Sequence, residues 1–113
     1  MTEGPDNIET DNQEKKTIAK MALYEVIDPE LNLNIIDLGL VYKLKFEGNP
    51  REIIVTMTFT TQFCPMGESI KDATIRAMED VFPQNDIQID LTFDPPWDQS
   101  MISERGLEYL NFG

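Results

Sequence analysis

The sequence predicts a two-layer α/β (α+β) sandwich, in which helices pack on one face of a small mixed three-stranded sheet. Three observations support this fold class. Three segments alternate between apolar and polar residues, which is the pattern of half-buried strands. Other segments carry apolar residues at helical spacing. The 113 residues suffice for a single domain with one core. The predicted order along the chain is α-β-β-α-β-α.

The N-terminal segment divides into a tail and a helix. Residues 1–10 are polar and acidic without periodicity, so we expect a disordered acidic tail before a single domain over residues 11–113. Asp11 and Glu14 have the spacing of a capping box, which predicts that a helix starts there. Asp28-Pro29 should stop this helix, because the residue before a proline avoids the helical region. The apolar stripe of the helix consists of Ala19, Ala22, Leu23 and Val26.

The remaining elements follow from the same two periodicities. In the first strand, the side chains expected to face the core are Tyr42, Leu44 and Phe46. In the second strand they are Ile53, Val55, Met57 and Phe59, and in the third Ile87, Ile89, Leu91 and Phe93. A helix over residues 66–82 joins the second and third strands, and its stripe is Met66, Ile70, Ala73, Ala77 and Val81. A short final helix is predicted over residues 103–110.

The connections bring three loops together. The sequence GNPR between the first two strands predicts a hairpin, so Gly39 should lie within a residue or two of Thr60 on the antiparallel neighbour. The third strand follows through a helix, which predicts a parallel pairing. Residues 34–40, 60–69 and 94–101 therefore meet at one rim of the sheet. Ligand sites in α/β sheets tend to lie at such carboxyl ends, so we expect the functional site there.

The rim contains the single cysteine of the chain, Cys64. We expect Cys64 at the N-cap of the second helix with Pro65 at the first helical position, where the free N–H groups and the helix dipole favour a thiolate. The carboxylate of Asp37 opposes that effect, so the predicted thiol is modestly activated. The residues alone leave a second interpretation open, in which Cys64 is a buried cap without chemical function.

Five further residues of the rim are candidates for the site. Asp37 is either a turn residue, with Gly39 supplying a positive φ, or a functional acid beside Cys64. We expect Trp97 to form a half-buried wall. Thr60 and Thr61 can bond loop backbone or a ligand oxygen.

Composition excludes several classes of function. The net charge is −12, from 21 acidic and 9 basic residues, and such a surface repels phosphate backbones and anionic lipids. We therefore expect no nucleic acid and no membrane among the partners. The N-terminus lacks the basic and apolar regions of a secretory signal, which predicts a cytoplasmic protein. The chain contains no histidine, so Ser-His-Asp and Cys-His pairs are excluded and no catalytic residues are assigned.

Three motifs resemble a known family. The segments DPELNLNIIDLGLVY, TMTFTTQFCPM and DPPWDQSMISERGLEYLNF are similar to the MIP-eighteen family, whose SufT-like and PaaD-like members are described as metal–sulfur cluster biosynthetic or iron–sulfur assembly factors. The resemblance runs from about residue 18 to residue 112 and implies the same small α/β fold. The chain lacks the cysteine-rich tail of the PaaD-like members, which places it on the SufT-like side.

The resemblance also implies roles for individual residues. Cys64 corresponds to the reactive cysteine of the family and Asp37 to the acid of its DLGLV segment. The family's DPE is matched by Asp28, Pro29 and Glu30, and its PPW includes Pro96 and Trp97. The chain departs from the family at residues 32–34 and at Gln62-Phe63, where proline or glycine is frequent.

These residues predict an iron–sulfur assembly or maturation factor that acts as a carrier or adaptor for apo-proteins. Cys64 would be a soft metal ligand and Asp37 a hard ligand or an acceptor behind it. Because a cluster takes about four thiolates, iron or a cluster should be held transiently between chains, by a homodimer or with a partner of the assembly machinery. The alternatives are a thiol-dependent redox or transfer enzyme using Cys64, and a pure adaptor with a structural Cys64. The sequence favours a carrier or adaptor over a catalyst of turnover.

Overall fold

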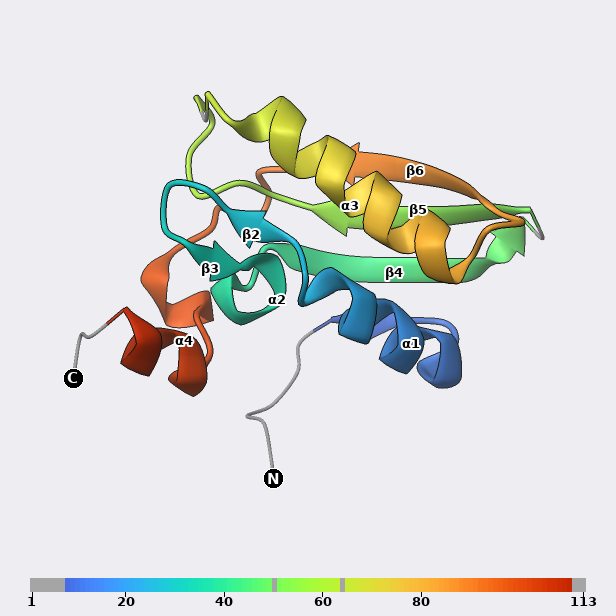
Figure 1. Cartoon of the computed structure of the whole chain (residues 1–113), viewed down its shortest axis with the longest axis horizontal. Coiled ribbons are helices and arrows are strands. Elements are labelled where there is room, and N and C mark those ends of the chain that lie inside the picture. The colour runs from blue at the N-terminus through green and yellow to red at the C-terminus, as the bar shows by residue number, and fades with distance from the viewer. Residues whose placement is uncertain (1–7, 50, 64, 111–113) are drawn as a thin grey trace.

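The computed structural model describes residues 8–49, 51–63 and 65–110 (Figure 1). Its elements, in chain order, are β1 (Glu9–Thr10), α1 (Gln13–Leu23), β2 (Ile27–Asp28), β3 (Leu33–Asn34), α2 (Ile35–Leu38), β4 (Val41–Asn49), β5 (Glu52–Met57), α3 (Gly67–Val81), β6 (Asp86–Leu91), the 3-10 turn η1 (Gln99–Met101) and α4 (Glu104–Tyr109). In the described residues, no helix is long and apolar enough to cross a membrane.

The main sheet has the predicted mixed topology and one strand more than expected. Its order is β1-β4-β5-β6. Strands β4 and β5 form the antiparallel hairpin, and β6 runs parallel to β5, as predicted. Helices α1 and α3 pack side by side on one face (Figure 1). The class of a two-layer α/β sandwich is therefore confirmed, and the extra pairs β1–β4 and β2–β3 correct the predicted count of three strands.

The N-terminal boundary differs from the prediction. Residues 1–7 lie outside the described part of the chain, but Glu9 and Thr10 form β1, parallel to β4, instead of belonging to a disordered tail. The ammonium of Lys16 donates to the carbonyl of Ile8 at 2.9 Å, which attaches the segment to α1. A two-residue strand carries no periodicity, so its pairing could not be read from the sequence.

Asp11 is not the N-cap of α1. That position belongs to Asn12, whose side chain accepts from the amide of Lys15 at 3.0 Å. The carboxylate of Asp11 instead accepts from the amides of Phe46 and Glu47 on β4, at 2.8 and 3.0 Å. Burial alone would raise the pKa of Asp11, but these amide donors outweigh it and hold the pKa below its ordinary value. Asp11 thus fastens the start of the chain to the edge of the sheet.

Strand β4 contains a bulge that changes the predicted facing of its side chains. Val41 pairs with Met57 and Lys43 with Thr56, so one extra residue, Tyr42, lies between these pairs. Val41 is buried in the core in place of Tyr42, whereas the inward positions further along the strand follow the prediction. Tyr42 was therefore wrongly expected to face the core, and the bulge turns it toward the loop that follows β6.

The core lies between the sheet and its two long helices. The inward side chains of β4 and β5 are fully or almost fully buried, and those of α1 and α3 close over them. Helix α3 matches its predicted extent to within one residue at each end, but its buried positions are Gly67, Ile70, Thr74 and Met78, so the predicted stripe was rotated. Helix α1 ends at Leu23, earlier than Asp28-Pro29, which lies instead where β2 turns toward β3.

Candidate functional site

The three predicted loops do meet at one end of the sheet. The amide of Thr58 donates to the carbonyl of Leu40 at 2.8 Å, and the indole N–H of Trp97 donates to the carbonyl of Leu38 at 2.6 Å. Beyond β5 and β6, the rings of Phe59 and Phe93 pack edge to face with centroids 6.4 Å apart. The loops that begin at residues 34, 60 and 94 are therefore held together by a fixed set of contacts.

Gly39 closes the first of these loops. It follows α2 with φ +79°, the left-handed conformation that ends a helix and that glycine adopts without strain. A Cβ atom built on Gly39 would overlap the carbonyl oxygen of Met101. Continuing the pairing of Val41 with Met57 puts Gly39 beside Phe59, one residue from Thr60. Both the positive φ and the approximate register of Gly39 agree with the prediction.

Asp37 is almost completely buried, at 6% exposure. One carboxylate oxygen accepts from the side-chain amide of Asn34 and the other from the hydroxyl of Ser103, each at 2.8 Å. Arg105 approaches the first oxygen at 3.5 Å. The backbone repeats the connection, because the carbonyl of Asp37 accepts from the amide of Ser103 at 2.8 Å. Asp37 therefore joins α2 to the start of α4.

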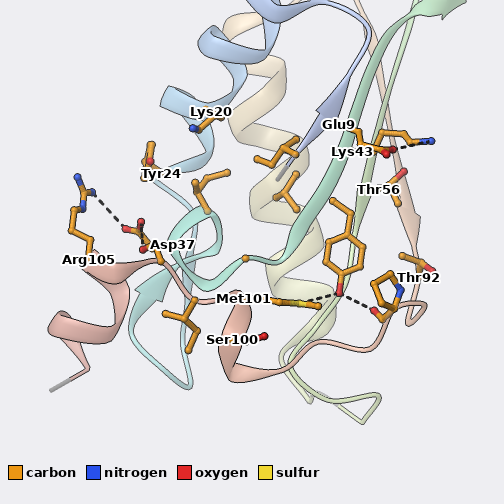
Figure 2. Close-up of a pocket in the computed structure, with 18 of the residues that line it drawn as sticks. Glu9, Lys20, Tyr24, Asp37, Lys43, Thr56, Thr92, Ser100, Met101 and Arg105 are labelled. Atoms are coloured by element: carbon orange, nitrogen blue, oxygen red, sulfur yellow. Dashed lines mark hydrogen bonds and ion pairs between the residues drawn. The ribbon is translucent and has the colours of Figure 1, made fainter. Parts of the chain in front are cut away.

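The partners of Asp37 were not predicted. Figure 2 shows its carboxylate pointing toward Arg105, on the side of the groove away from Thr56 and Thr92. The local part of the contact had a sequence signal, since Asn34 stands three residues before Asp37 and caps α2 by accepting from its amide at 2.8 Å. Ser103 lies 66 residues later, and no local pattern reveals such a contact. These donors anchor each oxygen of the carboxylate within the protein, with one hydrogen bond to each.

Trp97 and Tyr42 form the wall on the third loop. Trp97 is half-buried, as predicted, with its indole fixed on α2. The Tyr42 hydroxyl donates to the carbonyl of Pro95 at 2.8 Å and lies 3.6 Å from the sulfur of Met101. Burial raises the pKa of Tyr42, a hydrogen bond with Thr58 works against the rise, and the charge of Asp98 adds to it. Tyr42 therefore stays a neutral hydroxyl donor at physiological pH.

The loop between β5 and α3 is presented to solvent. Phe63 is 86% exposed, and Thr61, Gln62 and Pro65 are also exposed, whereas Thr60 is half-buried. The hydroxyl of Thr61 accepts from the amide of Phe63 at 3.3 Å, which stabilises the turn. Cys64 itself lies outside the described residues. Sequence reasoning gave no indication that its neighbour Phe63 would be so exposed.

Helix α3 begins with residues that differ from the predicted cap. Its N-cap is Met66 and its first residue is Gly67, so the interpretation of Cys64 as N-cap and Pro65 as first helical residue is wrong. The first turn of α3 packs so closely on the segment after β5 that a Cβ on Gly67 would approach the ring of Phe59 at 2.7 Å.

Glu30 occupies a separate turn. It is exposed between β2 and β3, and its amide donates to the buried carboxylate of Asp28 at 2.8 Å. Asp28 is 1% exposed and its carboxylate shapes this turn. The aspartate of the DPE motif therefore has a structural role. The structure thus brings Asp37, Gly39 and Trp97 together around α2 and leaves Thr60 and Thr61 on the exposed loop.

A groove of about 980 Å³ is lined by β4, β5 and β6 and continues past α2 to α4 and to the end of α1, and Figure 2 shows some of its lining. Of the predicted site residues, Asp37 and Gly39 line it. One wall carries Glu9 and Lys43, which form a loose ion pair at 3.9 Å, and the other carries Asp90 and Asp94. Within residues 8–49, 51–63 and 65–110, no group of three or more acidic, cysteine or histidine side chains is placed to hold a metal ion.

Comparisons with known proteins agree with this architecture. A family model described as "Iron-sulfur cluster assembly protein" matches residues 17–94. A Porphyromonas gingivalis protein named Fe-S protein maturation auxiliary factor is 37% identical over 100 residues, which span 88% of this chain and 93% of the relative. The Staphylococcus aureus protein Fe-S protein maturation auxiliary factor SufT is 37% identical over 78 residues, spanning 69% and 88% of the two chains.

The fold is also shared with a solved structure. A Bacillus anthracis protein described as a domain of unknown function, DUF59, superposes with a TM-score of 0.81 at 29% sequence identity. The superposition covers 89% of this chain and 95% of the other.

Proposed function

Since the chain belongs to the family of iron–sulfur cluster assembly proteins and therefore serves the assembly or maturation of iron–sulfur proteins, we propose that it acts there as a carrier or adaptor. The family confirms the resemblance to SufT-like proteins that the sequence motifs indicated. Its partners are iron–sulfur proteins or their assembly machinery, and within that group we propose apo-proteins that dock on the loop at residues 60–66. Such a role belongs in the cytoplasm, where we place the protein.

The exposure of Phe63 beside Cys64 carries this proposal. An aromatic side chain that is 86% exposed gains a large apolar area when a partner covers it, and such residues act as anchors of protein interfaces. The loop has a firm base, because Gly67, Phe59 and Phe93 pack together beneath it. A partner held by Phe63 would therefore be positioned next to the only thiol of the chain.

The cargo would be iron or an iron–sulfur cluster, with Cys64 as the thiolate ligand. A cluster takes about four cysteine thiolates, whereas each chain supplies one. Asp37 is no longer a candidate ligand in this proposal, because Asn34, Ser103 and Arg105 already occupy its oxygens. The cargo would therefore be shared between chains, either two copies or one copy and a partner protein. A site shared between chains suits a carrier that has to release what it binds.

Three variants test the proposal. Cys64→Ser removes the thiolate, Phe63→Ala removes the anchor, and Met21→Ala is the matched control, because Met21 is 69% exposed on α1, outside the loop. Each protein is reconstituted anaerobically with iron and sulfide and analysed by size-exclusion chromatography with iron detection. Transfer is then measured as the activity gained by an apo-form of a [4Fe–4S] dehydratase.

We expect Cys64→Ser to lose iron and transfer while it keeps its affinity for the apo-protein. Phe63→Ala should load iron normally but bind the apo-protein at least about fivefold more weakly, as expected for an anchor worth more than about 1 kcal/mol. Met21→Ala should behave as wild type. Transfer that survives Cys64→Ser would favour the pure adaptor. Multiple turnovers without a loaded complex would favour the thiol-dependent enzyme. Stoichiometric cluster on a stable monomer would contradict sharing between chains.

A further inference from the structure

Strand β6 forms an open edge of the main sheet. In the described residues, β5 is its only strand neighbour, and the order β1-β4-β5-β6 leaves its other side without a partner. The opposite edge is protected, because β1 covers part of β4 and the carboxylate of Asp11 occupies two of its amides. An unprotected strand edge is a template for pairing with another chain. The β6 edge is therefore open to a partner strand, whereas the opposite edge is partly covered.

The orientation of the backbone identifies the free groups. The amides of Asp86 and Thr92 donate toward the β5 side, to Arg51 and Met57, at 2.7 and 2.9 Å. Alternate residues of a strand point their N–H and C=O groups to opposite sides. Ile87, Ile89 and Leu91 therefore direct theirs outward, where the described part of the chain supplies no partner strand. Three donors and three acceptors are available along this edge.

The side chains of β6 separate into an acidic face and an apolar face. Asp86, Gln88 and Asp90 are exposed on the side of the sheet away from the helices. On the helix side, exposure increases toward the rim, from a buried Ile87 at 8% to Leu91 at 39%. A strand added to this edge would place alternate side chains beside the aspartates and the others beside Ile89 and Leu91.

A second copy of this chain is a poor occupant of the edge. Two β6 strands paired with each other would bring four aspartates onto one face, and like charges on adjacent strands are destabilising. Each copy also carries a net charge of −12, which opposes their approach. Acidic side chains on an edge strand prevent self-association while they attract a strand of opposite charge.

We propose that the β6 edge binds an extended segment of a partner protein, with Lys or Arg at alternate positions and apolar residues between them. The backbone of the segment would pair with Ile87, Ile89 and Leu91, its basic side chains would lie beside Asp86 and Asp90, and its apolar side chains would continue the core. This is the β-augmentation mode of peptide recognition. The inference depends on the sheet alone and is independent of the role proposed for the loop at residues 60–66.

The test uses two acetylated and amidated peptides, KVKVKVK and its acidic counterpart EVEVEVE. Binding is followed by amide chemical shifts in 15N-labelled protein and by hydrogen exchange. We expect the basic peptide to shift and protect the amides of residues 87, 89 and 91, and the acidic peptide to leave them unchanged. The proposal would be overturned if the chemical-shift changes were confined to other acidic surfaces of the protein, or if both peptides bound equally. Protection of the three amides that rises with protein concentration alone would identify a second copy as the occupant.

Two pairs of variants separate the backbone and charge contributions. Leu91→Pro removes an outward N–H that a proline can lack in an edge strand, and Leu91→Ala removes the same side chain but keeps the donor. The proline variant should lose peptide binding at least about fivefold more than the alanine variant, and equal losses would contradict strand pairing. Melting curves establish that the Leu91→Pro and Leu91→Ala variants are folded. The double variant Asp86→Asn/Asp90→Asn tests the charge contribution without altering the backbone of β6.

The charge variant has its own control. Asp86→Asn/Asp90→Asn should raise the Kd for KVKVKVK by about 2- to 25-fold, because each exposed ion pair contributes a factor of about 1.4 to 5. The control Glu14→Gln/Glu25→Gln changes the net charge equally through exposed residues of the α1 segment and should leave the Kd within about twofold. An equal effect of both double variants would show that binding follows the overall charge of the protein and would refute the assignment to β6.

Discussion

Replacement of Asp37 by Asn tests whether this residue holds the fold together or serves as a metal ligand. The substitution removes the charge from a carboxylate that accepts from Asn34 and Ser103 at 2.8 Å and faces Arg105 at 3.5 Å. Hydrogen bonds to charged groups contribute about 1.5–3 kcal/mol each. The ion pair with the largely exposed Arg105 adds at most about 1 kcal/mol. An asparagine keeps one acceptor oxygen, so we expect a loss of about 1–3 kcal/mol of unfolding free energy.

The loss converts into a measurable change of melting temperature. The entropy of unfolding is about 2.1 cal/mol/K per residue, so a chain of 113 residues loses roughly 4 °C for each kcal/mol. Asp37→Asn should therefore melt about 4–13 °C below wild type in a circular-dichroism scan. The exposed Asp72 on α3 provides the control, because Asp72→Asn makes the same chemical change on the surface and should shift the melting temperature by less than about 2 °C.

One combination of results would refute the structural role of Asp37. If Asp37→Asn melts like wild type but no longer loads iron or activates an apo-protein, its carboxylate is a ligand and the contact with Ser103 is dispensable. A destabilised variant that retains activity below its melting temperature would confirm that Asp37 positions α4.

Three further predictions concern single residues that hold the fold and the site in place. Gly39→Ala should lower the free energy of unfolding by about 2–4 kcal/mol, because alanine is strained at φ +79° and its Cβ overlaps the Met101 carbonyl. Urea unfolding measures this loss, and a change below about 1 kcal/mol would contradict the prediction. Asp11→Asn should destabilise the protein near pH 7, because the lowered folded-state pKa of Asp11 stabilises the fold above its unfolded-state pKa. This stabilisation disappears as pH falls through the folded-state pKa, so the difference in melting temperature between wild type and variant should shrink on acidification, and a difference that stays constant with pH would contradict it. Trp97→Phe should cost about 1–3 kcal/mol by leaving the carbonyl of Leu38 without its donor, and an unchanged urea midpoint would refute that contact.

The parts of the fold that the sequence predicted are those with sustained periodicity. Helix α3 and strands β5 and β6 alternate or repeat over six residues or more, so their positions were right to within a few residues. The bulge at Tyr42 was missed because it depends on which residue of β5 faces which residue of β4. Asp11 and Asn12 are equally good caps, and only the position of β4 decides that Asp11 turns away.

The candidate site was predicted in outline. The convergence of three loops follows from strand order and hairpin connectivity, both of which the sequence indicates. The environment of Asp37 did not follow, because Ser103 and Arg105 reach it from a segment that gave no more than a helical pattern. The exposure of Phe63 was also missed, since hydrophobicity alone predicts burial, whereas a short loop cannot bury every side chain.

The clasp between Asp37 and Ser103 has a consequence for synthesis of the protein. The two residues are 66 positions apart, so at about 5–20 residues per second the ribosome makes the second about 3–13 s after the first. During that interval the carboxylate of Asp37 has only its local partner Asn34, and α2 is without the segment that covers it. The β4–β5 hairpin can already form, because its contacts are local. The last step of folding is therefore the docking of the C-terminal helix, α4, and the native site exists only after that step.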